Sequence, residues 1–464
     1  MVSYYGSQRP IDFAKSALAF LLKHKVAFLL VFSVICSLYT HWMVMREFHM
    51  PTYGNTMIHV ASARHIIEHQ EYPLEDYSYG GGIPNLYVPL YRELVANTVL
   101  LTGFSLDFTS RMLVLLFAVM VPLGFFLLGR KLFGTNAGIL AAFLSVLPGE
   151  LLIYTVRPLP QALGLILLPI AFHALFAQKW KTALFLAFAI TMTHQEAIAF
   201  LVGGSGVFFG LTILFMVWKV LFSQGFNSAK ISNILKLNLA LIILAIAAYL
   251  LWQYSIVGHL NVLELAQFKN HEGNVVSMDS YLLKTGNLVS AFSMVGLVVC
   301  IGFILYYLIE TTGGLNDDMR RAMHTFSVFL FSAFCSFAFL TNFSMNRNMS
   351  LISISVPFFL GPLKGFEIIL LCLLAGLVSV AMVKTLYRHS EQFMKFDKLA
   401  YLFIFALFIA GLVAVKNDAL PFISPRVFMD RFLVYLQLPL ILLSALGADA
   451  VLEFLRKVPK LHLL

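Results

Sequence analysis

The sequence predicts an all-α, polytopic membrane protein with about 12 transmembrane helices. Of its 464 residues, 60% are hydrophobic and only 12% are charged, and a soluble chain of this length cannot bury so much apolar surface. Apolar runs of about 20 residues recur along the chain, which is the length that a helix needs to cross a bilayer. These runs lack the strict alternation of apolar and polar residues that a transmembrane β-barrel requires.

Twelve apolar runs are the predicted membrane spans. They lie at residues 26–45, 109–129, 135–155, 159–178, 182–195, 197–218, 237–257, 287–309, 322–340, 366–387, 398–415 and 432–454. With the N-terminus inside, the segments 130–134, 179–181 and 310–321 and the tail after residue 454 become cytoplasmic, and each carries Lys or Arg, as the positive-inside rule requires. We therefore expect a multi-pass protein of the cell membrane with both termini in the cytoplasm. The net charge of +9 reflects these loops, so no nucleic-acid partner is expected.

The extracytoplasmic side carries the longer connections. The first loop, residues 46–108, is by far the longest. Further external loops lie at 258–286, 341–365 and 416–431. Within the first loop, the segment YVPLYRELVANTVLL (87–101) is apolar but too short to cross, so we expect a helix lying on the membrane surface. No repeat or soluble domain interrupts the pattern, and residues 1–464 are taken as one integral membrane domain.

The first external loop opens with a candidate catalytic segment. Asn55 and His59 are four residues apart, so a helix that begins near Thr56 places them on one side and close together. Asn55 also suits the N-cap of that helix, because Gly-Asn-Thr before an apolar-periodic run is a typical helix start. A role in a site and a role as a cap are therefore both open for Asn55.

Three ionisable side chains lie in or beside apolar runs on the same side. His194 and Glu196 lie at the outer apex between the fifth and sixth predicted spans, and Glu150 lies near the outer end of the third. Ionisable groups at such positions are costly and are therefore candidates for function. The alternative is a buried polar network that only ties helix ends together.

External arginines form the third group of candidates. Arg157, Arg347, Arg426 and Arg431 all fall on the predicted outer side. The planar guanidinium group suits phosphate oxygens, and several converging on one cavity would hold a phosphate or diphosphate. Alternatively, an arginine at this rim snorkels to the interface, or pairs with Asp430.

Several motifs, taken in chain order, resemble the glycosyltransferases of the GT-C fold, especially archaeal members related to protein mannosyltransferases and aminoarabinose transferases. These motifs are GNTMIH (54–59), YP (72–73), LGRKLFG (128–134), PGELLIYTVRP (148–158), TH (193–194) and DRFLVYLQLPLILLSALGADAV (430–451). Each motif is loose, but their order covers most of the chain. Tyr435, in the last motif, is a further candidate substrate-binding residue beside Arg431.

The resemblance implies a GT-C fold and an integral membrane enzyme. Such an enzyme takes a sugar from a polyprenyl-phosphate donor, such as a dolichyl-phosphate hexose, on the extracytoplasmic side. The implied partners are this lipid-linked sugar, a lipid, glycan or protein acceptor, and membrane lipids, with the chain as a monomer. No cofactor is implied, and too few carboxylates converge to predict a divalent metal site. No WWD motif of the oligosaccharyltransferase type occurs, which disfavours transfer of a whole glycan.

The chain departs from the family at one position. An aspartate early in the first external loop deprotonates or orients the acceptor hydroxyl in this family, and that position is Asn55 in this chain. An amide cannot act as a general base, whereas a carboxylate can. Three explanations are open: an engineered substitution that disables the chemistry, a natural member that uses another base such as Glu150 or Asp76, or a non-catalytic descendant.

Two other classes of function compete with a transferase. A polytopic transporter or lipid flippase would be expected to show internal repeats and a site near the bilayer midplane, whereas no repeat is evident and the candidate polar groups lie at the outer boundary. A non-catalytic membrane protein that binds a glycolipid would share the pocket but would not turn over.

Overall fold

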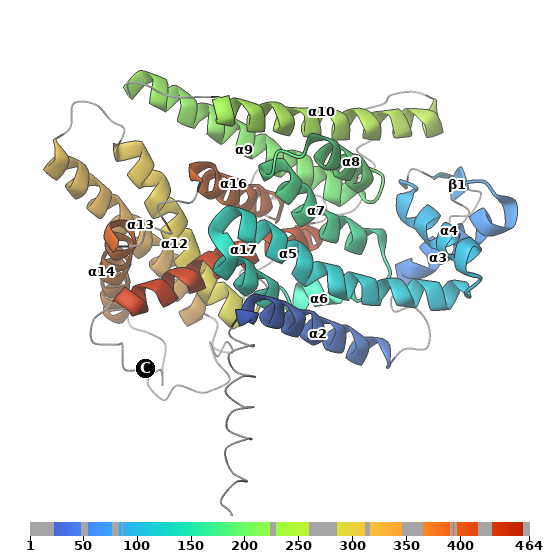
Figure 1. Ribbon diagram of the computed structural model, residues 1–464, viewed down its shortest axis with the longest axis horizontal. Helices are drawn as coiled ribbons and strands as arrows, with labels where there is room; N and C mark the ends of the chain where they lie inside the picture. The colour runs from blue at the N-terminus through green and yellow to red at the C-terminus, as the bar shows by residue number, and fades with distance from the viewer. Residues whose placement is uncertain are drawn as a thin grey trace, which may run out of the picture.

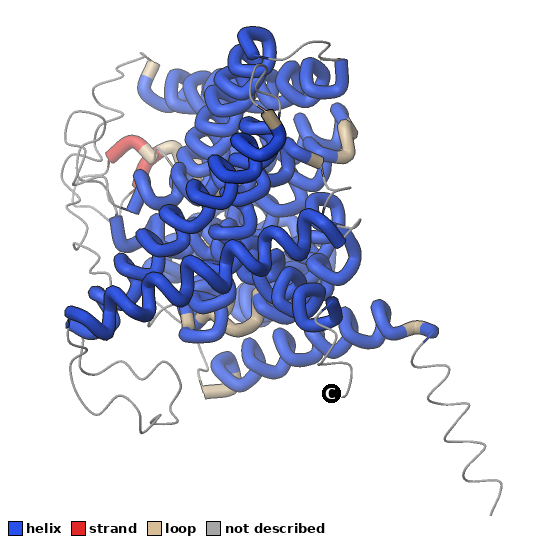
Figure 2. Tube along the Cα trace, turned by 90° about the vertical axis from the view of Figure 1, so that its left-hand side faces the viewer, coloured by secondary structure: helices blue, strands red, loops and turns tan. Residues whose placement is uncertain are grey.

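The computed structural model describes residues 23–47, 54–76, 83–85, 87–222, 229–258, 285–310, 316–345, 365–389, 393, 397–415 and 429–457. Nearly all of these residues are helical (Figures 1 and 2). Among them, the strands are β1 (Glu75–Asp76) and β2 (Ile83–Pro84), two residues each, which pair antiparallel in the first external loop. The predicted all-α fold class is confirmed.

Eight helices of the described residues are long and apolar enough to cross a membrane. They are α2 (Lys25–Met45), α5 (Leu106–Leu144), α9 (Gln195–Phe222), α10 (Ala229–Val257), α12 (Asn287–Glu310), α14 (Gly365–His389), α16 (Lys398–Val415) and α17 (Met429–Lys457). A ninth crossing follows if α6 (Gly149–Thr155) and α7 (Pro160–Phe176), which meet at a bend of 118°, form one broken span. The remaining helices include α8 (Trp180–Thr191) and α13 (Asp317–Met345).

This count is lower than the predicted 12 for reasons that lie in the chain. The predicted second span and the first part of the predicted third span fall within α5, which reverses at Phe133 and Gly134, where Gly134 has a φ of 84° that favours glycine. Its two arms pack closely, since a Cβ on Gly138 would lie 2.8 Å from the Cβ of Arg130. The third span is also interrupted before Pro148, and α8 has only 12 residues. The predicted spans are mostly helical in their described residues, and the reversal divides α5, which is counted here as one helix, at the connection predicted between the second and third spans.

The described residues of the predicted first external loop form a small helical unit at one end of the molecule (Figure 1). It contains α3 (Gly54–His69), the β1–β2 pair and α4 (Leu90–Thr102). With 13 residues, α4 is about 20 Å long at about 1.5 Å per residue, too short for a bilayer core of about 30 Å. The expectation of a short helix in this segment is met. α4 packs against α3, α5 and α7 with Tyr91, Arg92 and Val95 buried.

The helical core is most tightly packed where α12 meets α17. A Cβ on Gly296 of α12 would overlap the carbonyl oxygen of Leu443, and a Cβ on Gly447 of α17 would overlap the carbonyl oxygen of Phe292. Small residues let helix backbones approach closely in membranes, where van der Waals packing drives helix association. α17 is thereby fixed against the core, and its N-terminal end carries Arg431 into the candidate site.

Replacing Gly296 by alanine is expected to lower the free energy of unfolding by about 3 kcal/mol or more, because the new methyl group meets backbone that cannot rotate away. The measurement is thermal or denaturant unfolding of the purified protein in detergent. The matched control is Gly206→Ala on α9, where a Cβ meets nothing within 4 Å; it is expected to be neutral or slightly stabilising. An equal change in the free energy of unfolding in the two variants would contradict the close approach of α12 and α17.

Candidate functional site

The site begins on the inner face of α3. Thr56, His59, Val60, Ala63 and Ile66 are buried, and their spacing is that of a single helix face. α3 starts at Gly54, so Asn55 lies inside its first turn, one helical turn before His59. The backbone therefore brings residue 55 to the same end of the helix as His59, as expected from the sequence.

Arg92 of α4 holds this end of α3 to the rest of the loop. Its side chain is 1% exposed, and its Nε donates to Nδ1 of His59 at 3.2 Å. Nη1 donates to the Tyr72 hydroxyl at 2.8 Å and to Oδ1 of Asn85 at 3.1 Å. Nη2 is buried and has no hydrogen-bond partner in the described part of the chain. Arg92 forms no ion pair with a described carboxylate, so the hydrogen-bond partners of this buried cation are neutral groups.

Tyr87 links the loop to the transmembrane helices. Its ring lies 4.9 Å from the ring of His59 and 6.1 Å from the ring of His194, measured between centroids, and the guanidinium of Arg92 lies 4.9 Å from its centroid. The backbone reinforces the link, since the amide of Leu90 donates to the carbonyl of Met192 at 2.8 Å. Tyr87 and Leu90 of the predicted first external loop thus pack on the turn between α8 and α9.

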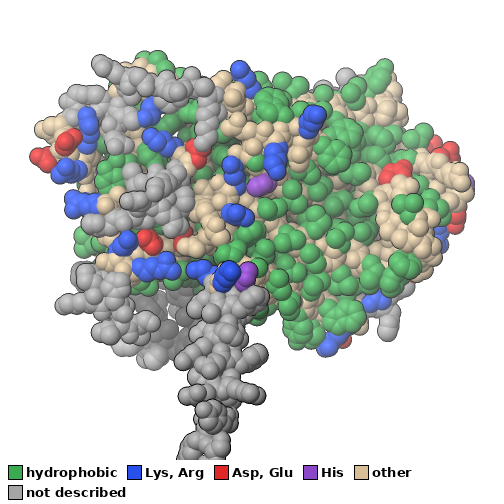
Figure 3. All heavy atoms as spheres, in the orientation of Figure 1, with side chains coloured by type: hydrophobic (Ala, Val, Ile, Leu, Met, Phe, Trp, Pro, Cys, Tyr) green, Lys and Arg blue, Asp and Glu red, His purple; other side chains and the backbone are tan. Residues whose placement is uncertain are grey.

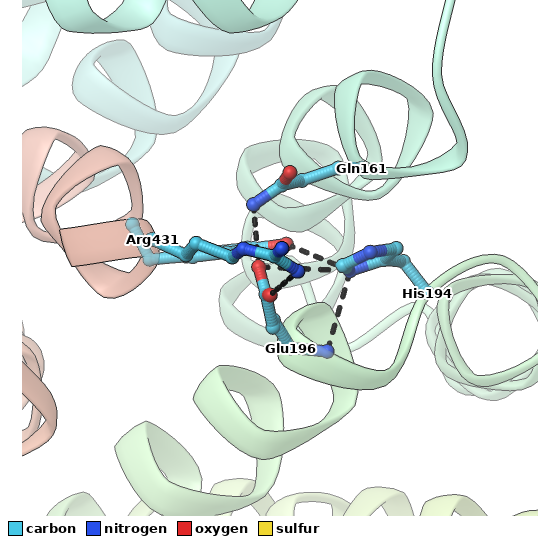
Figure 4. A network of polar contacts seen from close by, with 5 residues as sticks. Gln161, His194, Glu196 and Arg431 are labelled. Atoms are coloured by element: carbon cyan, nitrogen blue, oxygen red, sulfur yellow. Dashed lines mark hydrogen bonds and ion pairs between the residues drawn. The ribbon is translucent and has the colours of Figure 1, made fainter. Parts of the chain in front are cut away.

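A second polar cluster surrounds Glu196 at the start of α9 (Figure 4). Glu196 is 4% exposed, accepts a hydrogen bond from the amide of Gln161, and lies 3.5 Å from Nη1 of Arg431. Its own backbone amide donates to Nδ1 of His194 at 3.3 Å, and the Tyr435 hydroxyl lies 3.4 Å from the same nitrogen. Segments that are distant in sequence therefore meet around one carboxylate.

The two histidines are held in the neutral form. Nδ1 accepts a hydrogen bond in both His59 and His194, so the ring proton is on Nε2. Burial lowers the pKa of His59 well below its usual value, helped by the cationic Arg92. Burial and the nearby Arg431 lower the pKa of His194, in the turn between α8 and α9, to about 3. Each ring can donate a hydrogen bond from Nε2 without adding charge to the site.

A pocket lies between the two clusters. It holds about 30 Å³ of free space. The described residues that line it are His59, Tyr87, Tyr154, Arg157, Leu159, Pro160, Gln161, His194 and Arg431. This described lining contains two arginines and no carboxylate, and Glu196 contacts Arg431 without lining the pocket itself. The wall of the pocket is therefore cationic and suited to an anion.

The structure brings together six of the predicted site residues: His59, Arg157, His194, Glu196, Arg431 and Tyr435. Glu150 is buried in the first turn of α6 and does not line the pocket.

Four other candidates lie wholly or partly outside the described residues. The side chains of Asn55 and Asp76 lie outside the described part of the structure, as do Arg347 and Arg426 altogether. Their proposed roles stay predictions.

Sequence reasoning missed Arg92, Tyr87 and Gln161. The tyrosines between residues 72 and 91 are typical of a membrane-interface belt, but Tyr91 is 2% exposed and Tyr87 packs on two histidines. One signal could have identified Arg92: it is a lone arginine on the apolar face of a short helix, and a buried arginine needs hydrogen-bond or charge partners.

Among the described residues, no group of three or more His, Cys, Asp or Glu side chains is placed to hold a metal ion.

The fold is similar to solved archaeal oligosaccharyltransferases. One is AglB from Archaeoglobus fulgidus in complex with an inhibitory peptide and a dolichol-phosphate, with 15% identity, a TM-score of 0.43, and coverage of 94% of this chain and 51% of that chain. Another, from the same organism, is tethered to an acceptor peptide, with 13% identity, a TM-score of 0.36, and coverage of 96% and 58%. The chain spans about half the length of these proteins. No protein-family model and no curated protein sequence matches it.

Proposed function

We propose that the chain is a membrane glycosyltransferase of the GT-C type that uses a polyprenyl-phosphate-linked sugar, of the dolichyl-phosphate kind, on the extracytoplasmic face. The observation that carries the proposal is the cationic pocket between the first external loop and the starts of α7, α9 and α17. Arg157 and Arg431 supply its positive charge, and neutral His59 and His194 supply hydrogen-bond donors. This combination suits a phosphate group attached to a neutral sugar.

In the proposed reaction, a base removes the proton from an acceptor hydroxyl as its oxygen attacks the anomeric carbon of the donor. The bond between that carbon and the phosphate oxygen breaks, and its electron pair leaves with the polyprenyl phosphate. Arg157 and Arg431 would stabilise the charge that develops on the phosphate, which lowers the barrier. The carboxylate base expected from the family resemblance would act at position 55, one turn before His59. Asn55 can orient the acceptor hydroxyl but cannot take its proton, so turnover requires aspartate at position 55 or another base such as Glu150 or Asp76.

The pocket is small for a whole donor. Its free space of about 30 Å³ compares with roughly 300–1,000 Å³ in typical ligand pockets. We therefore expect the wall to open when the donor binds. The Arg431 side chain has room to move, because it is 35% exposed while its partner Glu196 is 4% exposed.

The proposal is favoured over a transporter by the position of the polar groups. They lie at helix ends and in the first external loop, whereas transporter sites lie near the bilayer midplane on broken helices. A glycolipid-binding protein without activity would share the same pocket, and turnover distinguishes it from a transferase. An assay that offers donors carrying one sugar and donors carrying a whole glycan, and measures transfer from each, distinguishes the two reactions.

The test is equilibrium binding of dolichyl phosphate to the purified protein in detergent. Replacing Arg157 by glutamine is expected to weaken binding about tenfold or more, because a hydrogen bond to a charged group contributes about 1.5–3 kcal/mol. The matched control is Arg64→Gln, which removes an exposed arginine of α3 on the same predicted side. Unchanged binding in Arg157→Gln, or equal binding of uncharged dolichol, would contradict the proposal.

A further inference from the structure

A second polar pocket lies where the end of α12, the start of α13 and the end of α14 meet. It holds about 540 Å³ of free space, far more than the donor pocket. Arg320, Arg321, Lys384 and Arg388 line it, and Asp317 is the acidic side chain of the described lining. None of these residues belongs to the proposed donor site. The predicted topology places the connections at this end, 310–321 and 388–397, in the cytoplasm.

The charges of this pocket are not balanced by the described lining. Asp317 lies 3.6 Å from Nη1 of Arg320, which leaves three further cations facing the same space. Nε of Arg320 is buried and has no hydrogen-bond partner among the described residues. Like charges that converge on one cavity repel each other, and an anion between them would remove this cost. In Figure 3, Lys and Arg side chains gather on the half of the molecule that holds α12, α13 and α14, whereas the other half of this face is mostly apolar.

Side-chain hydrogen bonds join the helices that line this pocket. The hydroxyls of Tyr306 and Tyr387 are hydrogen-bonded to each other at 2.6 Å and join α12 to α14 along its wall. His324 is buried, and its Nε2 lies 3.0 Å from the carbonyl oxygen of Gly302, so that nitrogen carries the proton and the ring is anchored to α12. These contacts link α12 to α14 and α13 to α12, and the cationic side chains line the space between the three helix ends.

We propose that this pocket binds the phosphate group of an anionic molecule, either a phospholipid headgroup or a free phosphate. Arginine and lysine side chains are the usual ligands of such oxygens, and basic pockets between transmembrane helices at the cytoplasmic side suit anionic headgroups. The neighbouring surface favours the lipid. Phe326 and Leu330 of α13 follow the cationic turn with 61% and 50% of their surface exposed, so acyl chains would lie against them.

The proposal is tested by thermal unfolding of the purified protein in detergent with three additives in turn. The additives are dioctanoyl phosphatidylglycerol, the zwitterionic dioctanoyl phosphatidylcholine, and inorganic phosphate. We expect phosphatidylglycerol to raise the melting temperature and phosphatidylcholine not to. A rise with inorganic phosphate at comparable concentrations supports the same site and identifies free phosphate as its ligand, whereas a rise with phosphatidylglycerol alone identifies a headgroup.

In the double variant Arg321→Gln/Lys384→Gln, we expect that at least ten times more phosphatidylglycerol is needed for the same rise in melting temperature. Both side chains are exposed, so the fold should be kept, and each single variant should show a smaller loss. The matched control is Arg456→Gln/Lys457→Gln, which removes the same charge at the end of α17 on the same predicted side, where both cations lie 3.7 Å from Glu453. The proposal would be overturned if phosphatidylglycerol did not raise the melting temperature, or if phosphatidylcholine raised it equally. An equally weakened response to phosphatidylglycerol in the control variant would also overturn it. Because the donor pocket is not touched, dolichyl phosphate binding should be unchanged in the double variant.

Discussion

Replacing Asn55 by aspartate is expected to raise the rate of sugar transfer by about 10²- to 10⁴-fold, the usual contribution of a positioned general base. Asn55 lies in the first turn of α3, one turn before the buried His59 that faces the cationic pocket. The amide can orient an acceptor hydroxyl but cannot take its proton, whereas a carboxylate of the same shape can do both.

The measurement is release of polyprenyl phosphate from labelled polyprenyl-phosphate sugars, with and without candidate acceptors. The matched control is Asn97→Asp, which makes the same change at an exposed position of α4. Thermal unfolding of each variant establishes that the fold is kept. If the unmodified chain already turns over and Asn55→Asp adds nothing, the base lies elsewhere, and the proposed role of position 55 is wrong.

Replacing Arg431 by methionine is expected to lower the free energy of unfolding by about 2–4 kcal/mol. Removing one partner of a fully buried pair costs about 3–5 kcal/mol, because the other charge stays buried without compensation. Glu196 is 4% exposed and cannot reach water easily, but the amide of Gln161 still donates to it, so the cost should fall below the full range.

The reverse substitution, Glu196→Gln, is expected to cost less, because Arg431 is 35% exposed and its charge can turn to solvent. The double variant with both substitutions should recover part of the loss, since no lone buried charge is left. Unfolding in detergent measures all three variants. Equal destabilisation by Arg431→Met alone and by the double variant would show that Glu196 does not depend on Arg431 for its charge.

The sequence was sufficient for the main features of the fold because the bilayer imposes simple rules. Apolar runs long enough to cross identified helices that the described part of the structure contains. His194 and Glu196 could be identified as candidates because ionisable groups are costly in an apolar run. The contact between Glu196 and Arg431 was not predicted.

The remaining features depend on contacts between distant segments. The hydrogen bonds of Arg92 to His59, Tyr72 and Asn85 join residues up to 33 positions apart, and no local periodicity indicates them. Likewise, nothing in an apolar run shows that α5 reverses tightly enough to press Gly138 on Arg130.

The central claim is that the cationic pocket beside α3 holds the phosphate of a lipid-linked sugar. The most direct test is an experimental structure of the chain with a dolichyl-phosphate hexose bound, in which the position of the phosphorus is measured. The account predicts phosphate oxygens within hydrogen-bond distance, about 3 Å, of Arg157 and Arg431, with the anomeric carbon facing the first turn of α3. A donor bound near the bilayer midplane, or with its phosphate away from both arginines, would contradict it.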